Sequence, residues 1–298
     1  MDEETVEKYV KAGKILKKVQ ENARKSIKPG QKMLEIAEKI EKEIVGEGGQ
    51  AAFPVNLSRN NFAAHFTPST SDEAVVGEKD VLKVDIGVHI DGFIADSAFT
   101  LDFSGENGKL LEASEKALQN ALSMVKEGQE IGKIGAEIEK TIKSYGFNPI
   151  QNLSGHGLGQ WVQHGAPTIP NIAKNDKRKL EDGIAFAIEP FATDGLGFVK
   201  EGVQAEIFQL DEPKPTRNKD SRKIIEFVDE NYKSLPFAER WIAKELKLSD
   251  FARKIALREL LKNKGISAFP ILHEENGKLV SQAETSIILN NGSVIILV

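Results

Sequence analysis

The sequence predicts an α+β fold made of two similar halves, each with antiparallel strands covered by helices, plus an inserted helical subdomain. Three observations lead to this prediction. A 17-residue stretch beginning at Lys28 recurs at Lys126, 98 residues later, with eight identical positions. Strand patterns with Asp-Gly and Asn-Gly turns occur between helical patterns. Residues 213–268 are helical in pattern and lie between two strand-like regions.

The repeated stretch suggests a duplicated half. Each copy is soon followed by Asn-Leu-Ser, at residues 56–58 and 152–154. Duplication would relate the two halves by a pseudo-twofold axis, with helices outside and a site where the halves meet. The alternative is that amphipathic helices rich in Lys, Glu and Ile resemble one another through composition alone. The sequence leaves both explanations open.

Helical spacing of apolar residues predicts four helices in the body of the chain. They are expected over Glu3–Ser26, Gln31–Val45, Leu110–Val125 and Ile131–Tyr145. Pro29 and Gly30 end the first helix, and Gly146 ends the fourth.

Strand patterns predict a hairpin in the first half, because two alternating segments flank Asp91-Gly92. Its strands are expected over Val81–Ile90 and Phe93–Phe103. Further strand-like segments are Ile184–Phe191, Gly202–Leu210 and Thr285–Val298, the last of which turns at Asn291-Gly292.

Residues 213–268 form the expected insert and read as helix throughout, with three apolar faces that must pack on each other or on the body. We therefore expect a catalytic domain of residues 1–212 and 269–298 and an inserted helical subdomain of residues 213–268. The net formal charge of −5 is unevenly spread. The insert carries 14 Lys/Arg against 8 Asp/Glu, so the rest of the chain is strongly acidic.

Composition excludes several kinds of protein. The chain has no cysteine, which excludes disulfides, thiolate metal sites, iron–sulfur clusters and a cysteine nucleophile. No apolar run is long enough to span a membrane. The acidic start, Met1-Asp2-Glu3-Glu4, is unlike a secretory signal. The expected location is the cytoplasm.

Two aspartates are predicted to share one face of the first hairpin. With a two-residue turn at Asp91-Gly92, Asp96 lies opposite Gly87 and Asp85 lies diagonal to Asp96. The opposite face of the hairpin is apolar. Two half-buried carboxylates repel unless a positive charge lies between them, and a divalent cation is the simplest candidate. The alternative is a pair of solvent-exposed aspartates on a one-sided sheet.

The segment Ser154–Gly165 carries two histidines among glycines at alternate positions. In a continuous strand, His156 and His164 would lie on one face and the glycines on the other. Such glycines allow close backbone approach. No phosphate-binding glycine pattern is present. The two histidines are candidates for a metal ligand and an acid–base group.

Three further candidates are weaker when taken singly. Glu189 ends an apolar strand before Pro190, Glu284 heads the last hairpin, and His65 lies among aromatic neighbours. Taken together with the residues above, four carboxylates and an imidazole suit Mn²⁺, Fe²⁺, Co²⁺ or Zn²⁺. So many carboxylates are typical of a two-metal hydrolytic site.

This ordered set of motifs resembles the pita-bread fold (M24) metallopeptidase family, and within it the type 2 methionine aminopeptidases of the short, archaeal form. The resemblance covers nearly the whole chain. The residues that carry it are Ala64-His65, Val84-Asp85-Ile86-Gly87, Ala95-Asp96-Ser97, Gly155-His156-Gly157, His164, Ala187-Ile188-Glu189-Pro190 and Gln282-Ala283-Glu284.

The resemblance implies a metal-dependent enzyme that removes the N-terminal methionine from nascent proteins when the second residue is small. It implies two divalent metal cations (Co, Mn, Fe or Zn) that activate a bridging water or hydroxide to attack the scissile carbonyl. The implied metal ligands are Asp85, Asp96, His156, Glu189 and Glu284, with Asp96 and Glu284 bridging.

The resemblance also implies which residues meet the substrate. His65 and His164 would contact it and assist at the scissile peptide, and Phe53 and Phe191 would line the methionine pocket. Gln163 stands beside His164 where an apolar neighbour is expected.

Two other functions stay open. One is a prolidase or aminopeptidase P that cleaves Xaa-Pro peptides. The other is a non-catalytic relative that binds RNA or protein, which the basic insert favours. The expected partners are nascent polypeptide N-termini and, through the insert, transiently the ribosome. No membrane partner is expected, and the protein is expected to be a monomer.

Overall fold

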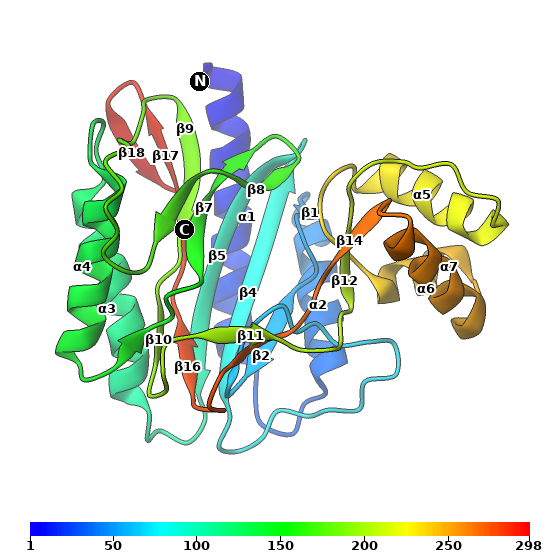
Figure 1. Cartoon of the computed structure of the whole chain (residues 1–298), viewed down its shortest axis with the longest axis horizontal. Helices are drawn as coiled ribbons and strands as arrows, with labels where there is room; N and C mark the ends of the chain where they lie inside the picture. Colours follow the sequence, from blue (N-terminus) through cyan, green and yellow to red (C-terminus); the bar gives the residue numbers. More distant parts are fainter.

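A computed structural model describes the whole chain, residues 1–298. Seven helices and antiparallel strands build it, which confirms the predicted α+β class. Figure 1 shows the strands in the middle, α3 and α4 along one side and the insert on the other. The helices are α1 (Glu3–Ser26), α2 (Met33–Gly46), α3 (Gly108–Met124), α4 (Ile131–Ser144), α5 (Lys219–Asn231), α6 (Glu239–Leu246) and α7 (Asp250–Lys262).

The four predicted body helices are present, and each boundary lies within two residues of its predicted position. Their apolar residues repeat at helical spacing and are buried on one face. The first helix also begins at a good capping residue, because the Asp2 carboxylate accepts a hydrogen bond from the Thr5 backbone N–H at 2.7 Å.

The first sheet contains the predicted hairpin. Its strands are β1 (Gln50–Ala51), β2 (Asn56–Arg59), β4 (Val81–Ile90) and β5 (Phe93–Asp102), and β4 pairs with the other three. Asp91 and Gly92 have positive φ angles of 51° and 85°, as a tight two-residue turn requires. Asp96 therefore lies opposite Gly87, in the predicted register.

The second sheet runs in the order β18-β17-β9-β7-β8. Its strands are β7 (Ser154–Gly159), β8 (Val162–Pro170), β9 (Ile184–Ile188), β17 (Thr285–Asn290) and β18 (Ser293–Ile296). The two histidines do not lie on one continuous strand, because the chain turns at Gln160 and Trp161. The Trp161 backbone N–H donates to the Gly92 carbonyl oxygen at 2.8 Å, so this turn is held against the tip of the first hairpin.

Short strands complete the fold and correct two boundaries. They are β3 (Phe62–Ala64), β6 (Asn148–Pro149), β10 (Phe191–Thr193), β11 (Val199–Glu201), β12 (Ile207–Leu210), β13 (Phe237–Ala238), β14 (Ile266–Phe269), β15 (Leu272–Glu274) and β16 (Val280–Gln282). The strand predicted from Ile184 breaks at Glu189-Pro190, where proline offers no N–H for pairing. The strand predicted from Gly202 begins only at Ile207.

The two copies of the repeat make equivalent contacts. Lys32 bridges to Val75 in the first half, and Glu130, 98 residues later, bridges to Lys179 in the second. The Gly30 backbone N–H donates to the Val76 carbonyl, and that of Gly128 donates to Leu180. Composition alone does not explain matching contacts outside the helices. The structure therefore favours duplication.

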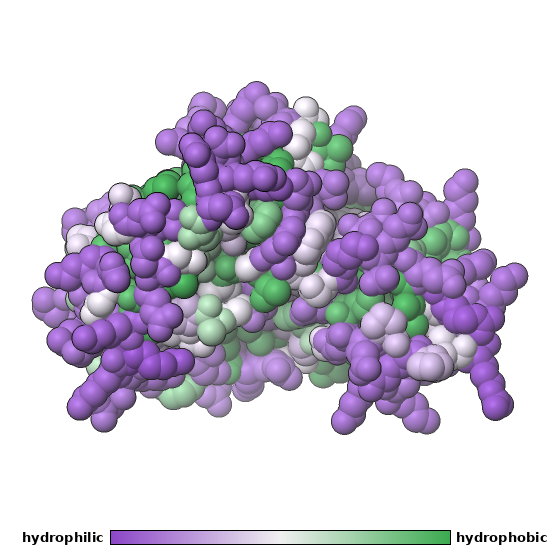
Figure 2. Space-filling model, turned by 90° about the horizontal axis from the view of Figure 1, so that it is seen from above, coloured by the Kyte–Doolittle hydropathy of each residue, from purple (hydrophilic) through white to green (hydrophobic).

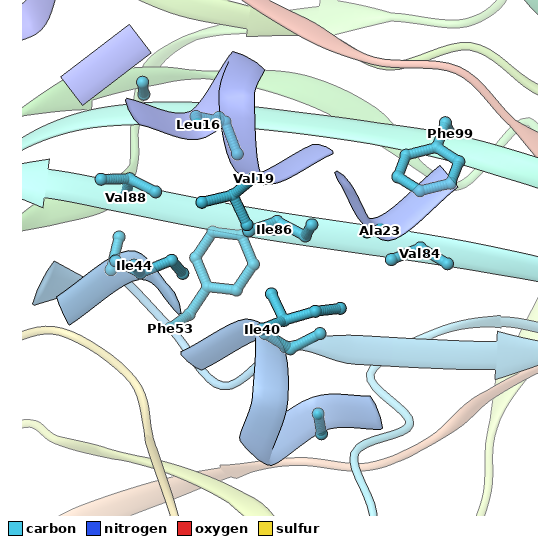
Figure 3. Packing of buried hydrophobic residues seen from close by; sticks show 14 of the residues in the cluster. Leu16, Val19, Ala23, Ile40, Ile44, Phe53, Val84, Ile86, Val88 and Phe99 are labelled. Carbon is cyan, nitrogen blue, oxygen red and sulfur yellow. The ribbon is translucent and has the colours of Figure 1, made fainter. Parts of the chain in front are cut away.

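There are two large apolar cores. One surrounds the first hairpin and also takes in Leu158, Ala185 and Ile288 of the second sheet, and the other lies among α3, α4, β9 and β17. Strands β5 and β17 lie against each other. Figure 3 shows part of the larger core, where α1 residues such as Val19 and α2 residues such as Ile40 surround Ile86 of β4. Across the β5–β17 seam, the Ser97 hydroxyl donates to the Glu284 carbonyl oxygen at 2.6 Å. The seam thus places Asp96 of one half beside Glu284 of the other.

The insert has its own apolar core, but it is not helical throughout. Phe237 and Ala238 form β13, which pairs with β12 of the body, and β14 pairs with the other side of β12. Phe208 and Leu210 of β12 join the insert core. Pairing with an existing strand has outweighed the helical pattern here.

Polar and charged residues dominate the face shown in Figure 2, with hydrophobic residues visible between them. No helix combines the length and the apolar character that crossing a bilayer requires.

Candidate active site

A cavity of about 290 Å³ is lined by residues from both halves and from the β12–β14 region. All nine residues that the sequence singled out line it: Phe53, His65, Asp85, Asp96, His156, His164, Glu189, Phe191 and Glu284. The cavity lining contains no lysine or arginine. Four carboxylates therefore face one space without a cationic side chain among them.

His156 lies close to three of the four carboxylates. Its Nε2 lies 3.8 Å from Asp96 Oδ2, 3.7 Å from Glu189 Oε1 and 4.0 Å from Glu284 Oε1. These distances are longer than hydrogen bonds. They fit atoms that share a cation, since metal–nitrogen and metal–oxygen bonds are roughly 2.0–2.2 Å long. One ligand atom each of Asp96, His156 and Glu284 falls within 4.8 Å of the others.

Burial makes the carboxylates unusually hard to ionise. Burial raises the pKa of Asp85 to about 7. The pKa of Asp96 is raised well above its usual range by burial and then by the charge of Asp85. Burial and neighbouring carboxylates also raise the pKa of Glu189 and of Glu284. A divalent cation would remove this repulsion and hold all four groups ionised.

Buried oxygens without a hydrogen-bond partner give a second test of whether the site fits a metal. Asp85 Oδ1 and Asp96 Oδ1 are buried and have no hydrogen-bond partner in the protein. Burial, and then the neighbouring His164, lowers the pKa of His156 to about 3, so its ring is neutral and Nε2 can offer a lone pair. The donor set, its spacing and its unpaired oxygens all fit divalent cations.

Neighbouring amides and hydroxyls hold these groups in place. Gln282 Nε2 donates to Glu284 Oε2 at 3.1 Å. The Asp96 backbone N–H donates to Ser286 Oγ at 2.9 Å. Asn171 Nδ2 donates to the Glu189 carbonyl oxygen at 3.1 Å. Asn171 was not singled out in the sequence, because no local pattern marks it.

His65 and His164 lie at the same side of the cavity, and both contact Phe269, with ring centroids 5.4 Å and 6.0 Å away. The His164 ring is also 4.6 Å from that of His156, across the β7–β8 hairpin. Burial lowers the pKa of both His65 and His164 to about 4. Both side chains are therefore neutral at physiological pH.

His65 is further fixed by its backbone and by one hydrogen bond. Its φ of 65° is uncommon for a residue other than glycine. Its Nδ1 lies 3.3 Å from the Pro270 carbonyl oxygen. A carbonyl only accepts, so Nδ1 carries the proton and Nε2 of the neutral ring is an acceptor.

Phe53 and Phe191 supply the apolar wall of the cavity, and they are 3% and 1% exposed. A Cβ at Gly87 would overlap the Phe53 ring, so the glycine makes room for that ring. His89 is buried at the turn, where its Nδ1 accepts from the Gly92 N–H at 3.1 Å.

Gln163 lies inside the cavity wall beside His164, and it is 9% exposed. The Gln163 side chain lowers the pKa of the neighbouring Asp96 carboxyl, against the larger effect of burial. The polar Gln163 side chain thus has the Asp96 carboxyl as a polar neighbour.

Comparison with known proteins agrees with this geometry. The profile of metallopeptidase family M24 matches residues 7–210. The chain is 46% identical over 298 residues to a methionine aminopeptidase of Archaeoglobus fulgidus, covering 99% of each chain. It is 46% identical over 292 residues to that of Pyrococcus abyssi, covering 98% of each.

Solved structures show the same fold. A thermophilic Arx1 superposes with a TM-score of 0.86 at 20% identity, over 100% of this chain and 91% of the other. A methionine aminopeptidase from Thermotoga maritima gives a TM-score of 0.72 at 21% identity, over 100% and 97%. The predicted pita-bread fold is confirmed. By its sequence match, its fold and its cluster of candidate ligands, the chain belongs to metallopeptidase family M24.

Proposed function

We propose that this protein is a metal-dependent methionine aminopeptidase, which removes the first methionine from peptide chains whose second residue is small. The observation that carries the proposal is the gathering of four carboxylates and one neutral imidazole around a single cavity with an apolar wall. Similarity along the full length to archaeal methionine aminopeptidases supports it.

Five residues would hold two divalent cations, with Asp96 and Glu284 shared between them. The ligands are Asp85, Asp96, His156, Glu189 and Glu284. Such a pair, when bound, lowers the pKa of a water between the cations and polarises a carbonyl oxygen. The chain's own part is to hold the ligands, through Gln282 on Glu284 and Asn171 on Glu189.

The remaining cavity residues would bind and orient the peptide. Phe53 and Phe191 offer an apolar surface for the methionine side chain. Neutral His65 accepts at Nε2, where it would meet the N–H of the scissile peptide. Neutral His164 would accept a proton from the attacking water and pass it to the departing amine.

The cellular setting is also part of the proposal. A monomer in the cytoplasm would act on nascent N-termini, and the basic insert would bring it transiently to the ribosome. Two of the insert's cations are not available for this, because Arg240 pairs with Glu41 and Arg253 pairs with Glu239 inside the protein. Co-sedimentation with ribosomes at low salt that is lost at high salt is the expected result. No co-sedimentation at low salt would contradict ribosome docking.

Peptide cleavage by reconstituted protein tests the enzymatic proposal. Protein freed of metal by a chelator is given Co²⁺, Mn²⁺, Fe²⁺ or Zn²⁺ in turn and assayed with Met-Ala-Ser and with an Xaa-Pro peptide. Release of methionine from Met-Ala-Ser only in the presence of metal is expected. Cleavage of the Xaa-Pro peptide alone would indicate a prolidase-type activity, and no cleavage with any metal would contradict the proposal.

A further inference from the structure

Asn56 is a buried residue of the cavity wall whose side-chain carbonyl has no partner. The residue is 5% exposed and lines the cavity. Its Nδ2 donates to the Pro54 carbonyl oxygen at 2.8 Å. A backbone carbonyl only accepts, so this bond fixes the orientation of the amide. Asn56 Oδ1 is then the free end, and no group of the protein donates to it.

The position of Asn56 points to a donor bound in the cavity. Asn56 on β2 lies directly opposite Asp85 on β4. Residues directly opposite on antiparallel strands point to the same face, so the amide and the Asp85 carboxylate share the cavity side of the sheet. Buried acceptors in native proteins almost always have a donor. Since the protein supplies no donor for Asn56 Oδ1, the donor is expected on a molecule bound in the cavity.

The shape of the site limits which group of a bound peptide can donate to Asn56 Oδ1. A second cavity of about 270 Å³ shares His65, Asn152 and Phe269 with the first and reaches the exposed Glu201. A bound peptide would leave the site on this side. Asn56 and Phe53 line the first cavity but not the second, so they lie away from the wall that the two cavities share. We take this part of the first cavity as its inner end.

The inner end would hold the first residue of the substrate. Its side chain would pack on Phe53, and its carbonyl oxygen can only accept. The one strong donor left on that residue is its free α-amino group. A ligand without the amino group would leave the buried Asn56 oxygen unpaired, and would therefore bind more weakly.

We propose that Asn56 accepts a hydrogen bond from the α-amino group of the substrate and thereby makes the site specific for unblocked chain ends. The inference rests on the proposed function, because that function sets the direction of the bound peptide. Asn56 would be a specificity-determining residue that touches the substrate.

Calorimetric binding of two ligands tests this role without turnover. The ligands are methionine and 4-(methylthio)butanoate, which lacks only the amino group. They are titrated into Mn²⁺-loaded protein, and the ratio of their affinities measures recognition of the amine. We expect Asn56→Leu, which keeps the size and removes the acceptor, to reduce this ratio about tenfold. An unchanged ratio in folded Asn56→Leu would overturn the inference.

Asn152 provides the matched control. It also lines the cavity, but its Nδ2 donates to the Val199 carbonyl oxygen at 2.7 Å and its Oδ1 accepts from the Val199 N–H at 3.0 Å. Both ends of this amide are already paired within the protein. Asn152→Leu is therefore expected to leave the affinity ratio as in the wild type. An equal fall in both variants would contradict a special role for Asn56.

A crystal structure of the wild-type protein with methionine and Mn²⁺ tests the same contact should Asn56→Leu fail to fold. The amino nitrogen is expected within hydrogen-bonding distance of Asn56 Oδ1, and an amino group turned away from it would overturn the inference. Peptide cleavage separates the two proposals. Binding of methionine through Asn56 without any cleavage would refute the proposed function alone, and cleavage with an unchanged ratio in Asn56→Leu would refute only this inference.

Discussion

The carboxylates of the cavity repel one another, and this repulsion opposes folding while no cation is bound. Asp96 and Glu284 are 1% and 4% exposed, so solvent cannot screen their charges. Folding of the metal-free chain therefore has to protonate these groups or bear their repulsion. Bound metal is expected to add stability as well as activity.

Asp96→Asn is the first prediction at this scale. Loss of a bridging carboxylate is expected to lower kcat/KM by about a thousandfold, because metal binding and charge stabilisation are lost together. The same change is expected to raise the melting temperature of metal-free protein, since Asn avoids the free-energy cost of protonating or burying the Asp96 carboxylate on folding. Peptide cleavage and calorimetry measure the two effects.

The control is Asp91→Asn, which makes the same chemical change at the exposed turn of the same hairpin. Wild-type activity is expected there, since Asn also suits a positive φ. Full activity in Asp96→Asn would refute its assigned role.

The pH dependence of metal-free stability is the second prediction. Folding raises the pKa of Asp85 to about 7, above its value in the unfolded chain. The folded state then holds a proton that the unfolded state has lost, so stability falls as pH rises from about 4 to about 7. Chelator-treated protein is expected to melt at lower temperature at pH 8 than at pH 5, and Asp85→Asn is expected to weaken this trend. An equal fall in melting temperature in the wild type and in Asp85→Asn would show that Asp85 does not cause the pH dependence.

Individual site residues were predictable where spacing determines their position. The Asp91-Gly92 turn fixes Asp96 opposite Gly87, and the register follows by counting. Asn56 could not be found this way, because its importance lies in a side-chain oxygen that is left unpaired only in the folded chain. The role of Gly87 could not be found from the sequence either, since its contact with Phe53 joins segments that are distant in the chain.

At the scale of elements, the β7–β8 hairpin depends on two glycines that admit neighbouring backbone. A Cβ at Gly155 would overlap the Ala187 carbonyl, and one at Gly157 would overlap the Ala166 carbonyl. A Cβ at Gly159 would meet only the Val162 side chain, at 3.5 Å. The alternating glycines were predicted to allow close approach, and two of the three do so.

Gly157→Ala is the third prediction. Because backbone rather than a flexible side chain blocks the added methyl group, we expect a loss of about 1–3 kcal/mol in the free energy of unfolding, together with displacement of His156 and lower activity. Urea denaturation and peptide cleavage measure both. Gly159→Ala, two residues along the same strand, is expected to stay close to the wild type. Equal losses in both variants would contradict this explanation.

Elements with a strong local pattern were predicted well, and those set by distant contacts were not. Glu3–Ser26 is helical as expected because its apolar face and its cap are both local. The turn at Gln160 and Trp161 carries no common turn sequence and is held by Gly92, far away in the chain. Phe237 and Ala238 look helical but pair with β12, a partner that the sequence does not reveal.

At the scale of the whole molecule, a buried ion pair ties the insert to the first half. Arg240 of α6 pairs with Glu41 of α2, and their side chains are 3% and 13% exposed. Trp241 Nε1 also donates to Glu41, at 2.9 Å. Together with the strands β13 and β14 on β12, these contacts fix the insert beside the cavity wall.

Glu41→Ala is the fourth prediction. Removing one partner leaves the Arg240 charge buried and unpaired, so we expect a loss of about 3–5 kcal/mol in the free energy of unfolding, measured by denaturant titration. Faster amide exchange is expected in α6 than in α3. The control is Glu73→Ala, which breaks an exposed pair with Lys32 and is expected to change stability little. A small loss in Glu41→Ala would show that the strands alone hold the insert.

The proposed function depends on five side chains, from two similar halves, that bind a pair of divalent cations. Anomalous X-ray diffraction from crystals of the Mn²⁺-loaded protein, collected at the manganese absorption edge, tests it most directly. Two peaks about 3.5–4 Å apart are expected between Asp96 and Glu284, in contact with Asp85, His156 and Glu189. Peaks elsewhere in the protein, or no peak at this cluster, would contradict it.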